Sequence, residues 1–286
     1  MNLTGAARLA GIIGWPIAQS LSPRLHSYWL NELAIDGAYV PLAVRPEDFS
    51  TVVVGLQKAG FAGVNVTVPH KEAAFALCHD CDSAARAAGA VNLLIFRGDG
   101  RIEGRNTDAP GLVASLRAEL GADVVSGKPA VILGAGGAAR AAVVALQEMG
   151  AGEIRIVNRS RGRADRLAHE LAPKSNIAVF DSKDWPRAAA GVALVVHATS
   201  AGMKGAPSLE ISLEPLPKSA VICDIVYNPL ETPLLVRAKK AGFKTIDGLG
   251  MLMHQAVPAF AAFYGQEPKV TPGLRKELQE ALSSGK

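Results

Sequence analysis

Eight short apolar runs, rich in β-branched residues, recur along the chain, and segments with helical spacing of apolar positions separate them. The runs are GIIGW (11–15), AYVPLAV (38–44), GVNVTV (63–68), VNLLIF (91–96), AVILG (130–134), EIRIVN (153–158), ALVVHAT (193–199) and AVICDIV (220–226). Alternation of strands and helices is typical of α/β proteins with mostly parallel sheets. Because the runs show no fixed-period repeat, we expect two sheets rather than a solenoid.

The pattern changes at two places, which suggests two domains. The segment NTDAPGLVASLRAELGA predicts a helix that begins near Asp108 and leads into a glycine-rich turn. After Asp247, GLGMLMHQAVPAFAAFYG and TPGLRKELQEALSSG predict two helices with no strand between them. Periodicity alone leaves open whether these tail helices cover the second domain or return to the first.

Composition narrows the class of protein. The chain has 286 residues, of which 49% are hydrophobic and 20% charged, which is globular composition at a length of about two domains. The net charge is only +4 and most basic residues are scattered, so we expect no nucleic-acid partner. Three cysteines fit a reducing compartment, and the sequence shows neither an export signal nor a membrane span. We therefore expect a cytoplasmic protein.

The segment VILGAGGAAR (131–140) joins a predicted strand to a predicted helix through glycines spaced as in a dinucleotide-binding turn. Gly134 allows the tight turn, Gly136 lets the backbone approach a pyrophosphate, and Ala139 takes the third small position. Gly137 and Ala138 open the helix, whose amides and dipole attract an anion. The motif predicts a dinucleotide site; the alternative is a purely structural turn.

A basic segment follows where an NAD-binding protein places an acidic residue on the ribose. Here the chain has Asn158, Arg159, Ser160 and then Arg163. A guanidinium forms charge-assisted bonds with a 2′-phosphate, whereas a carboxylate repels it, so we expect NADP rather than NAD. The alternative is a solvated or nucleic-acid-binding helix face made of Arg155, Arg159, Arg161, Arg163 and Arg166.

The segment GVNVTVPHK (63–71) carries polar residues on one strand face, because Asn65 and Thr67 alternate with valines, and Lys71 follows. Lys71 and Asp108 form a possible acid–base pair in which the carboxylate orients the ammonium. The alternatives are a surface lysine, and helix capping by Asn106, Thr107 or Asp108.

Two serines precede a predicted helix in GWPIAQSLSPRLHSYW. Ser22 followed by Pro23 favours an N-cap, which does not explain Ser20. Both hydroxyls near a helix N-terminus could instead hold a small carboxylate.

Other polar positions are less informative. Cys78-His79-Asp80-Cys81 resembles half a metal site without a second half, so we expect no metal. Thr199 ends a buried-looking strand, which predicts either a place in the cofactor crevice or a plain turn, and the role of His197 stays open. Gln255 is a polar residue in an apolar helix and needs a partner if it is buried.

Taken together, these motifs resemble the shikimate dehydrogenase family over nearly the whole chain. The matching segments are GWPIAQSLSPRLH, GVNVTVPHK, GAVN, NTD, GAGGAAR, NRS, ATSAGM, DIVYNPLETPLL and GLGMLMHQA, in family order. The resemblance implies an α/β substrate domain (1–108 plus 247–286), to which the C-terminal helices return, and a doubly wound Rossmann-type NADP domain (109–246).

The resemblance also implies roles for individual residues. The shikimate carboxylate is bound by Ser20 and Ser22. The ring hydroxyls are contacted by Asn65, Thr67, Lys71, Asn92, Asp108 and Gln255, with Tyr227 near the substrate. The cofactor is contacted by the glycine turn, by Asn158, Arg159 and Ser160 at the 2′-phosphate, and by Thr199, Gly248 and Met251.

The function implied is reversible NADPH-dependent reduction of 3-dehydroshikimate to shikimate, a step toward aromatic amino acids, with Lys71 and Asp108 as the acid–base pair. Two residues depart from the commonest family pattern, Ser27 and His197, where Asn is usual. The alternatives are a quinate/shikimate dehydrogenase of broader specificity and a non-catalytic NADP- or shikimate-binding sensor. The sequence leaves open whether the chain is a monomer or a homodimer.

Overall fold

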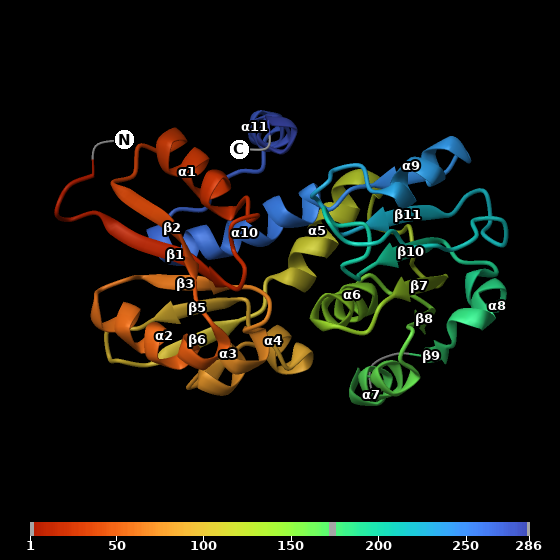
Figure 1. Cartoon of the computed structure of the whole chain (residues 1–286), viewed down its shortest axis with the longest axis horizontal. Helices are drawn as coiled ribbons and strands as arrows, with labels where there is room; N and C mark the ends of the chain where they lie inside the picture. The colour runs from red at the N-terminus through yellow and green to blue at the C-terminus, as the bar shows by residue number, and fades with distance from the viewer. Residues whose placement is uncertain (1–2, 172–175, 285–286) are drawn as a thin grey trace. The chain divides into compact units, whose positions relative to one another are not determined.

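The computed structural model describes residues 3–171 and 176–284. Strands in this range form two six-stranded sheets (Figure 1). The chain divides into two compact units, Met1–Asp108 with Gln255–Ala281, and Ala109–His254 with Leu282–Lys286. All eight predicted strands are present, and the predicted α/β fold with two sheets is confirmed.

The sheet of the first unit is mixed, with the strand order β2-β1-β3-β5-β6-β4. Its strands are β1 (Arg8–Gly14), β2 (Gly37–Ala43), β3 (Gly63–Val66), β4 (Asp80–Cys81), β5 (Leu93–Phe96) and β6 (Ile102–Arg105). β1 pairs in parallel with β2 and β3, whereas β5 is antiparallel to β3 and β6. The turn between β5 and β6 is too short for a crossover helix, so this pair has to be antiparallel.

Helices cover both faces of the first sheet. They are α1 (Ser22–Glu32), α2 (Phe49–Lys58) with the 3-10 turn η1 (Pro46–Asp48) before it, α3 (Lys71–Leu77) and α4 (Ser83–Ala88). Phe49 and Val53 of α2 and Ala74 of α3 pack on one face, against a core that includes Val64 and Val66 of β3. Trp29 of α1 lies against aromatic residues of the tail on the other side.

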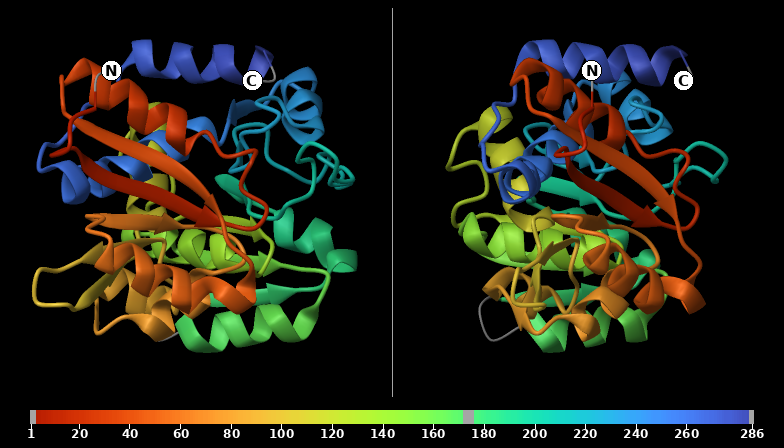
Figure 2. Two further views of the ribbon diagram at one scale, coloured as in Figure 1. Left: turned by 60° about the vertical axis from the view of Figure 1, so that its left-hand side comes forward. Right: turned by 90° about the vertical axis from the view of Figure 1, so that its left-hand side faces the viewer.

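The tail helices α10 (Leu249–Tyr264) and α11 (Pro272–Ser284) settle the question left open by periodicity. Trp29 Nε1 donates to the carbonyl of Lys269 (3.0 Å), and the Tyr264 hydroxyl donates to the carbonyl of Ala38 (2.9 Å). Arg24 forms an ion pair with Glu277, and Figure 2 shows α11 running beside α1. The prediction that the C-terminal helices return to the first domain is confirmed.

The sheet of the second unit is entirely parallel, with the strand order β12-β11-β10-β7-β8-β9. Its strands are β7 (Pro129–Leu133), β8 (Glu153–Val157), β9 (Ile177–Phe180), β10 (Leu194–His197), β11 (Val221–Asp224) and β12 (Lys244–Ile246). Helices of this unit are α5 (Asp108–Leu120), α6 (Gly137–Glu148), α7 (Arg161–Leu171), α8 (Trp185–Ala189), preceded by the 3-10 turn η3 (Ser182–Asp184), and α9 (Pro233–Lys240).

Two separate apolar cores lie on the two faces of this parallel sheet. One contains Ile132 and Val196 with residues of α5, α6 and α7, and the other contains Val131 and Val195 with residues of α8 and α9. Successive residues of a strand point to opposite faces, so the sheet is covered on both sides. The predicted doubly wound Rossmann-type arrangement is confirmed.

The sequence did not predict the strands β4, β6, β9 and β12, which have two to four residues each. Three of them are edge strands, which are commonly short and bury fewer apolar side chains. None of the helices in the described part of the chain has the length and apolar character needed to cross a membrane.

Candidate active site

The first helical residues of α3 and α5 bring a lysine and a carboxylate together. Lys71 Nζ forms an ion pair with Asp108 Oδ2, although the two residues lie 37 positions apart in sequence. The side chains are 21% and 11% exposed, respectively. The two side chains predicted to pair are therefore in contact, and both are largely shielded from water.

Asn92 holds the carboxylate of this pair in one orientation. Its Nδ2 donates to Asp108 Oδ1 (2.8 Å) and to Thr107 Oγ1 (3.0 Å), and its Oδ1 accepts the backbone N–H of Thr107 (2.8 Å). Each carboxylate oxygen of Asp108 thus has its own donor, because Asn92 binds Oδ1 and Lys71 binds Oδ2. A buried side chain with several such bonds is rigid, which pre-organises the pair.

The sequence left open which of Asn106, Thr107 and Asp108 binds the backbone at the start of α5, and in the structure Asn106 does so. Its Oδ1 accepts the backbone N–H of Asp108 (3.0 Å) where α5 begins. Because Asn106 satisfies this amide, the carboxylate of Asp108 is free to bind Lys71.

Asn65 and Gln255 join the same network. The amide of Asn65 accepts from the Tyr39 hydroxyl (2.7 Å) and donates to the carbonyl of Asn92 (3.1 Å). Gln255 Oε1 lies 3.3 Å from the hydroxyl of Thr107. Thr67 follows the end of β3 and is partly exposed.

The structure corrects the prediction that Ser22 is the N-cap of α1. Ser22 is the first residue of α1 rather than its N-cap, which is Leu21, and no side chain caps the helix. Leu21 already has helical dihedral angles (φ −85°, ψ −7°), so the first turn starts one residue early. Ser20 does have a local contact, because its Oγ accepts the backbone N–H of Ser22 (3.3 Å).

The glycine turn at the end of β7 has the shape that a dinucleotide site needs. Gly134 has φ +124°, and a Cβ there would lie 2.8 Å from the carbonyl oxygen of Ala198. Apart from its chain neighbours and the backbone of its own helix, a Cβ at Gly136 or Gly137 would meet no atom of the described residues within 4 Å, and none of their side chains caps α6. The N-terminal amides of α6 are therefore open to an anion, and Ala139 is fully buried between helix and sheet. These residues fit the pyrophosphate of NADP.

The arginine cluster divides into paired and available side chains. Arg155 binds Glu153 (2.7 Å) and the carbonyl of Ala190 (2.7 Å). Arg161 binds Asp165 (3.1 Å) and Asp181 (3.3 Å). By contrast, three exposed side chains pair with no carboxylate within residues 3–171 and 176–284: Arg166 in α7 and, closer to the end of β8, Arg159 and Arg163.

Arg159 and Arg163 follow β8, where a dinucleotide places its adenine ribose. Asn158 steadies the turn, because its Nδ2 donates to the carbonyl of Ser160 (2.9 Å). Two unpaired guanidinium groups at this place fit the 2′-phosphate of NADP.

Three further residues expected at the cofactor lie in the second unit. Thr199 follows β10, and its Cγ2 would be 3.0 Å from a Cβ at Gly134. A Cβ at Gly248 would lie 2.1 Å from the carbonyl oxygen of Ile225, so only glycine fits there. Met251 packs on a core of the same unit, and Tyr227 is half-buried after β11.

Cys78 and Cys81 are free thiols in the first unit. Burial raises the pKa of Cys78 to about 12, so this thiol stays protonated. Within residues 3–171 and 176–284, no group of three or more His, Cys, Asp or Glu side chains has the geometry of a metal site.

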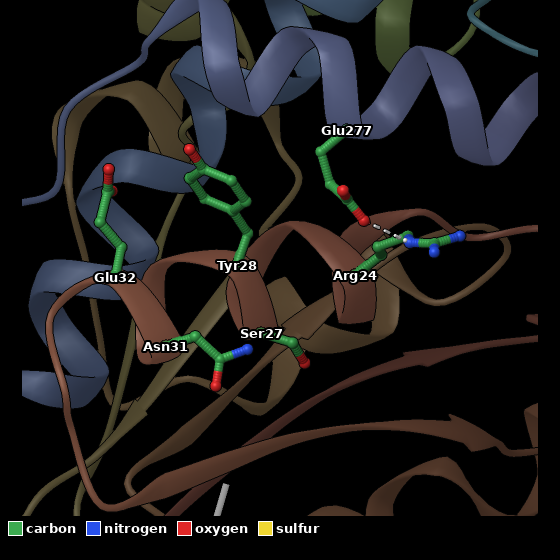
Figure 3. A pocket seen from close by; sticks show the side chains of 6 residues that line it. All are labelled: Arg24, Ser27, Tyr28, Asn31, Glu32 and Glu277. Carbon is green, nitrogen blue, oxygen red and sulfur yellow. Dashed lines mark hydrogen bonds and ion pairs between the residues drawn. The ribbon is translucent and has the colours of Figure 1, made fainter.

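A hollow on the first unit has none of the predicted site residues in its lining (Figure 3). It is lined by Arg24, Ser27, Tyr28, Asn31, Glu32 and Glu277. Arg24 and Glu277 point toward each other across α1 and α11 and form an ion pair of 2.9 Å. Ser27, which departs from the usual family residue, lines this hollow.

Tyr39 and Thr107 shape the site but were not singled out for it from the sequence. Tyr39 lies in a strand 26 residues from Asn65, and its hydroxyl is committed to that amide. Its position in an apolar run gives no local indication of this bond. Thr107 was considered only as a helix cap.

Residues 12–94 match the shikimate dehydrogenase substrate-binding domain, and residues 117–227 match shikimate / quinate 5-dehydrogenase. The shikimate dehydrogenase (NADP(+)) of Paramagnetospirillum magneticum is 51% identical over 273 residues, which are 96% of this chain and 98% of that protein. The chain belongs to the shikimate dehydrogenase family.

Solved structures agree with this assignment. The shikimate 5-dehydrogenase of Thermus thermophilus, in complex with NADP(H) and shikimate, is 33% identical with a TM-score of 0.83 and covers 98% of this chain and 100% of its own. Quinate dehydrogenase of Corynebacterium glutamicum, in complex with NAD, is 29% identical with a TM-score of 0.88, covering 96% and 99%. The predicted shikimate dehydrogenase family is confirmed.

Proposed function

We propose that this chain catalyses the reversible reduction of 3-dehydroshikimate to shikimate with NADPH, in the shikimate pathway to aromatic amino acids, and that Lys71 and Asp108 are its acid–base pair. The chain is an NADP-dependent oxidoreductase of the shikimate dehydrogenase type. The observation that carries the assignment of the pair is the contact between Lys71 and Asp108, fixed by Asn92.

The reaction needs a proton at the carbonyl oxygen of the substrate. NADPH, when bound, supplies the hydride for the carbonyl carbon. Lys71 donates a hydrogen bond and then a proton to the oxygen that gains charge, and in the reverse direction it accepts this proton. Asp108 keeps the ammonium in place, and Asn92 keeps Asp108 in place. A positioned acid of this kind contributes about 10² to 10⁴ in rate.

The other groups bind the substrate without exchanging protons. Ser20 and Ser22 hold its carboxylate through neutral donors at the start of α1. Its ring hydroxyls are contacted by Asn65, Thr67, Asn92 and Gln255, as well as by Lys71 and Asp108, and Tyr227 lies near the substrate. The amide of Asn65 suits this role because its bonds to Tyr39 and Asn92 fix its orientation.

Two sets of residues in the second unit bind the two phosphate-containing parts of the cofactor. The pyrophosphate is held by Gly134, Gly136, Gly137 and Ala138. The 2′-phosphate is held by Asn158, Arg159, Ser160 and Arg163, and the rest of the cofactor contacts Thr199, Gly248 and Met251.

At the level of the whole chain, residues 1–108 with 247–286 form the substrate domain, and residues 109–246 form the NADP domain. The protein acts in the cytoplasm on a small molecule, as a monomer or homodimer, without a nucleic-acid or membrane partner.

The reaction is tested by following NADP reduction optically with shikimate or quinate, each with NADP or NAD. We expect fast reduction for shikimate with NADP. Lys71→Ala should lower kcat by about 10² to 10⁴ while NADPH still binds. The matched control is Lys58→Ala, which removes an exposed lysine of α2 and should leave kcat unchanged.

Other results would select the alternatives. Comparable turnover of quinate would make the chain a quinate/shikimate dehydrogenase of broader specificity. Binding of NADPH without turnover of either substrate would make it a sensor. Near wild-type kcat in Lys71→Ala would reject the acid–base assignment.

A further inference from the structure

A buried histidine–aspartate pair lies at the end of two neighbouring strands, and none of the roles above uses it. His197 ends β10 and Asp224 ends β11, at directly paired positions. Their side chains are 1% and 0% exposed. His197 Nδ1 lies 2.9 Å from Asp224 Oδ1, away from the N–H direction of a well-formed hydrogen bond, so the contact is mainly electrostatic.

Asp224 is anchored independently of the histidine. Its Oδ1 accepts the backbone N–H of Val226 (3.0 Å), and its Oδ2 accepts the Thr232 hydroxyl (2.6 Å). Two donors aimed at one carboxyl group fix its orientation. A carboxylate oxygen beside Nδ1 would repel a ring lone pair there, so the neutral imidazole of His197 carries its proton on Nδ1.

This tautomer determines what the neighbouring hydroxyl does. His197 Nε2 lies 2.6 Å from Thr199 Oγ1, and with its proton on Nδ1 the ring can only accept there. Thr199 therefore donates its single proton to His197. One lone pair of Oγ1 accepts the backbone N–H of Ala201 (3.1 Å), which leaves one lone pair for a ligand.

The partly exposed Thr199 lies against the glycine turn, because its Cγ2 would be 3.0 Å from a Cβ at Gly134. The arginines expected at the adenine ribose follow β8, on the other side of β7 from β10. A dinucleotide bound across this turn therefore places its nicotinamide half on the β10 side. The donors of that half are ribose hydroxyls and the carboxamide amine, whereas the pyrophosphate only accepts.

We propose that His197, held by Asp224, is a positioning residue that fixes the Thr199 hydroxyl as a hydrogen-bond acceptor for the nicotinamide-ribose half of NADP. This rests on the proposed cofactor site. Asp224 orients the ring, the ring takes the threonine proton, and the threonine oxygen receives a ribose hydroxyl or the carboxamide amine.

A double-mutant cycle on ligand binding tests this chain of contacts. The dissociation constant of NADPH is measured calorimetrically for wild type, Thr199→Val, His197→Asn and the double variant. Asn reaches the position of the Nδ1 atom and not that of Nε2, so it keeps a polar group near Asp224 and releases Thr199. The adenine-side fragment 2′,5′-ADP is the second ligand, and Ser219→Ala removes an exposed hydroxyl as a control.

We expect Thr199→Val to weaken NADPH binding about 3- to 10-fold, the effect of one lost neutral hydrogen bond. His197→Asn should weaken it about 2- to 5-fold, and the double variant should be no worse than Thr199→Val, because His197 acts through Thr199. Binding of 2′,5′-ADP should stay unchanged in all variants. Additive losses, an equal loss for 2′,5′-ADP, or no loss in Thr199→Val would each overturn the proposal.

The tautomer is tested separately in the wild-type protein by ¹⁵N NMR of the histidine rings, with the His197 resonances assigned from His197→Asn. A neutral ring protonated on Nδ1 supports the proposal, and one protonated on Nε2 overturns it. The binding and NMR measurements are made without shikimate, so they do not depend on whether the chain turns it over. A chain that binds NADPH but does not turn over shikimate would overturn the proposed reaction and leave the cycle readable.

Discussion

The two units prepare their ligand sites in opposite ways. In the first unit, polar side chains of the site are bonded mainly to one another: Lys71 to Asp108, Asp108 to Asn92, and Asn92 to Thr107. In the second unit, the proposed cofactor site consists of groups that no side chain of the described residues occupies: the N-terminal amides of α6 and the guanidinium groups of Arg159 and Arg163. A site that moves a proton needs fixed side chains, whereas a site that binds phosphates needs free donors.

The largest effect on stability and NADPH binding is expected from a substitution in the glycine turn. Gly134→Ala places a Cβ against the carbonyl oxygen of Ala198 at a positive φ, so we expect a loss of about 3–4 kcal/mol in the free energy of unfolding. NADPH binding should be lost as well, because the turn has to move. Urea unfolding and calorimetry measure the two effects.

The control for that variant comes from the first unit. Gly55 lies inside α2 with open space around its Cβ position, so Gly55→Ala should stabilise the protein by about 0.5–1 kcal/mol. If Gly134→Ala were as well tolerated as Gly55→Ala, the turn would not require glycine.

Substituting one asparagine in each unit by alanine compares how strongly the two sites depend on side-chain hydrogen bonds. Asn92→Ala removes a buried side chain and leaves the Thr107 amide without its acceptor, so we expect a loss of about 2–3 kcal/mol in the free energy of unfolding. Asn158→Ala removes one local bond at the surface of the second unit and should cost less than about 1 kcal/mol. Equal losses in urea unfolding would contradict the description of the first site as an interlocked network.

The two units also differ in how a histidine makes the free energy of unfolding depend on pH. Burial lowers the pKa of His26 in the first unit from 6.5 to about 3. Between these values the unfolded chain binds a proton that the folded chain does not, so stability falls as the pH drops from 6.5 toward 3. At pH 5 this amounts to about 2 kcal/mol. His26→Phe keeps the stacking on Tyr39 and removes a buried nitrogen without a hydrogen bond.

The stability difference between pH 7.5 and pH 5 should therefore shrink by about 2 kcal/mol in His26→Phe, as measured by urea unfolding at both pH values. The exposed His169 of the second unit provides the control, and His169→Gln should leave the difference unchanged. An unchanged difference in His26→Phe would mean that another group controls acid unfolding.

The smallest effect is expected at Arg159. Arg159→Ala should weaken NADPH binding about tenfold, because one exposed charge-assisted contact with the 2′-phosphate is lost. NADH, which lacks this phosphate, should bind as before. Arg117→Ala, on α5 of the same unit, is the control. An equal loss for NADPH and NADH would place Arg159 away from the phosphate.

The same contrast explains what the sequence could predict. The glycine turn and the arginine segment are local, so their spacing within about 30 residues identifies them. The contact of Lys71 with Asp108 spans 37 positions, and only the fold brings the two residues together. The bond from Tyr39 to Asn65 was not predicted because a tyrosine in an apolar run is usually a core residue. The capping of α1 was predicted one residue too late, since Leu21 adopts helical dihedral angles that its residue type does not indicate.

The return of the tail to the first unit has a consequence for synthesis on the ribosome. Residues 255–281 supply part of the apolar layer around Trp29 and Tyr39, yet they emerge only after residues 109–254 of the second unit. At typical elongation rates, this delay is on the order of ten seconds. During that time the nascent first unit exposes an unfinished apolar surface, so it is the part of the chain most prone to aggregate before synthesis ends.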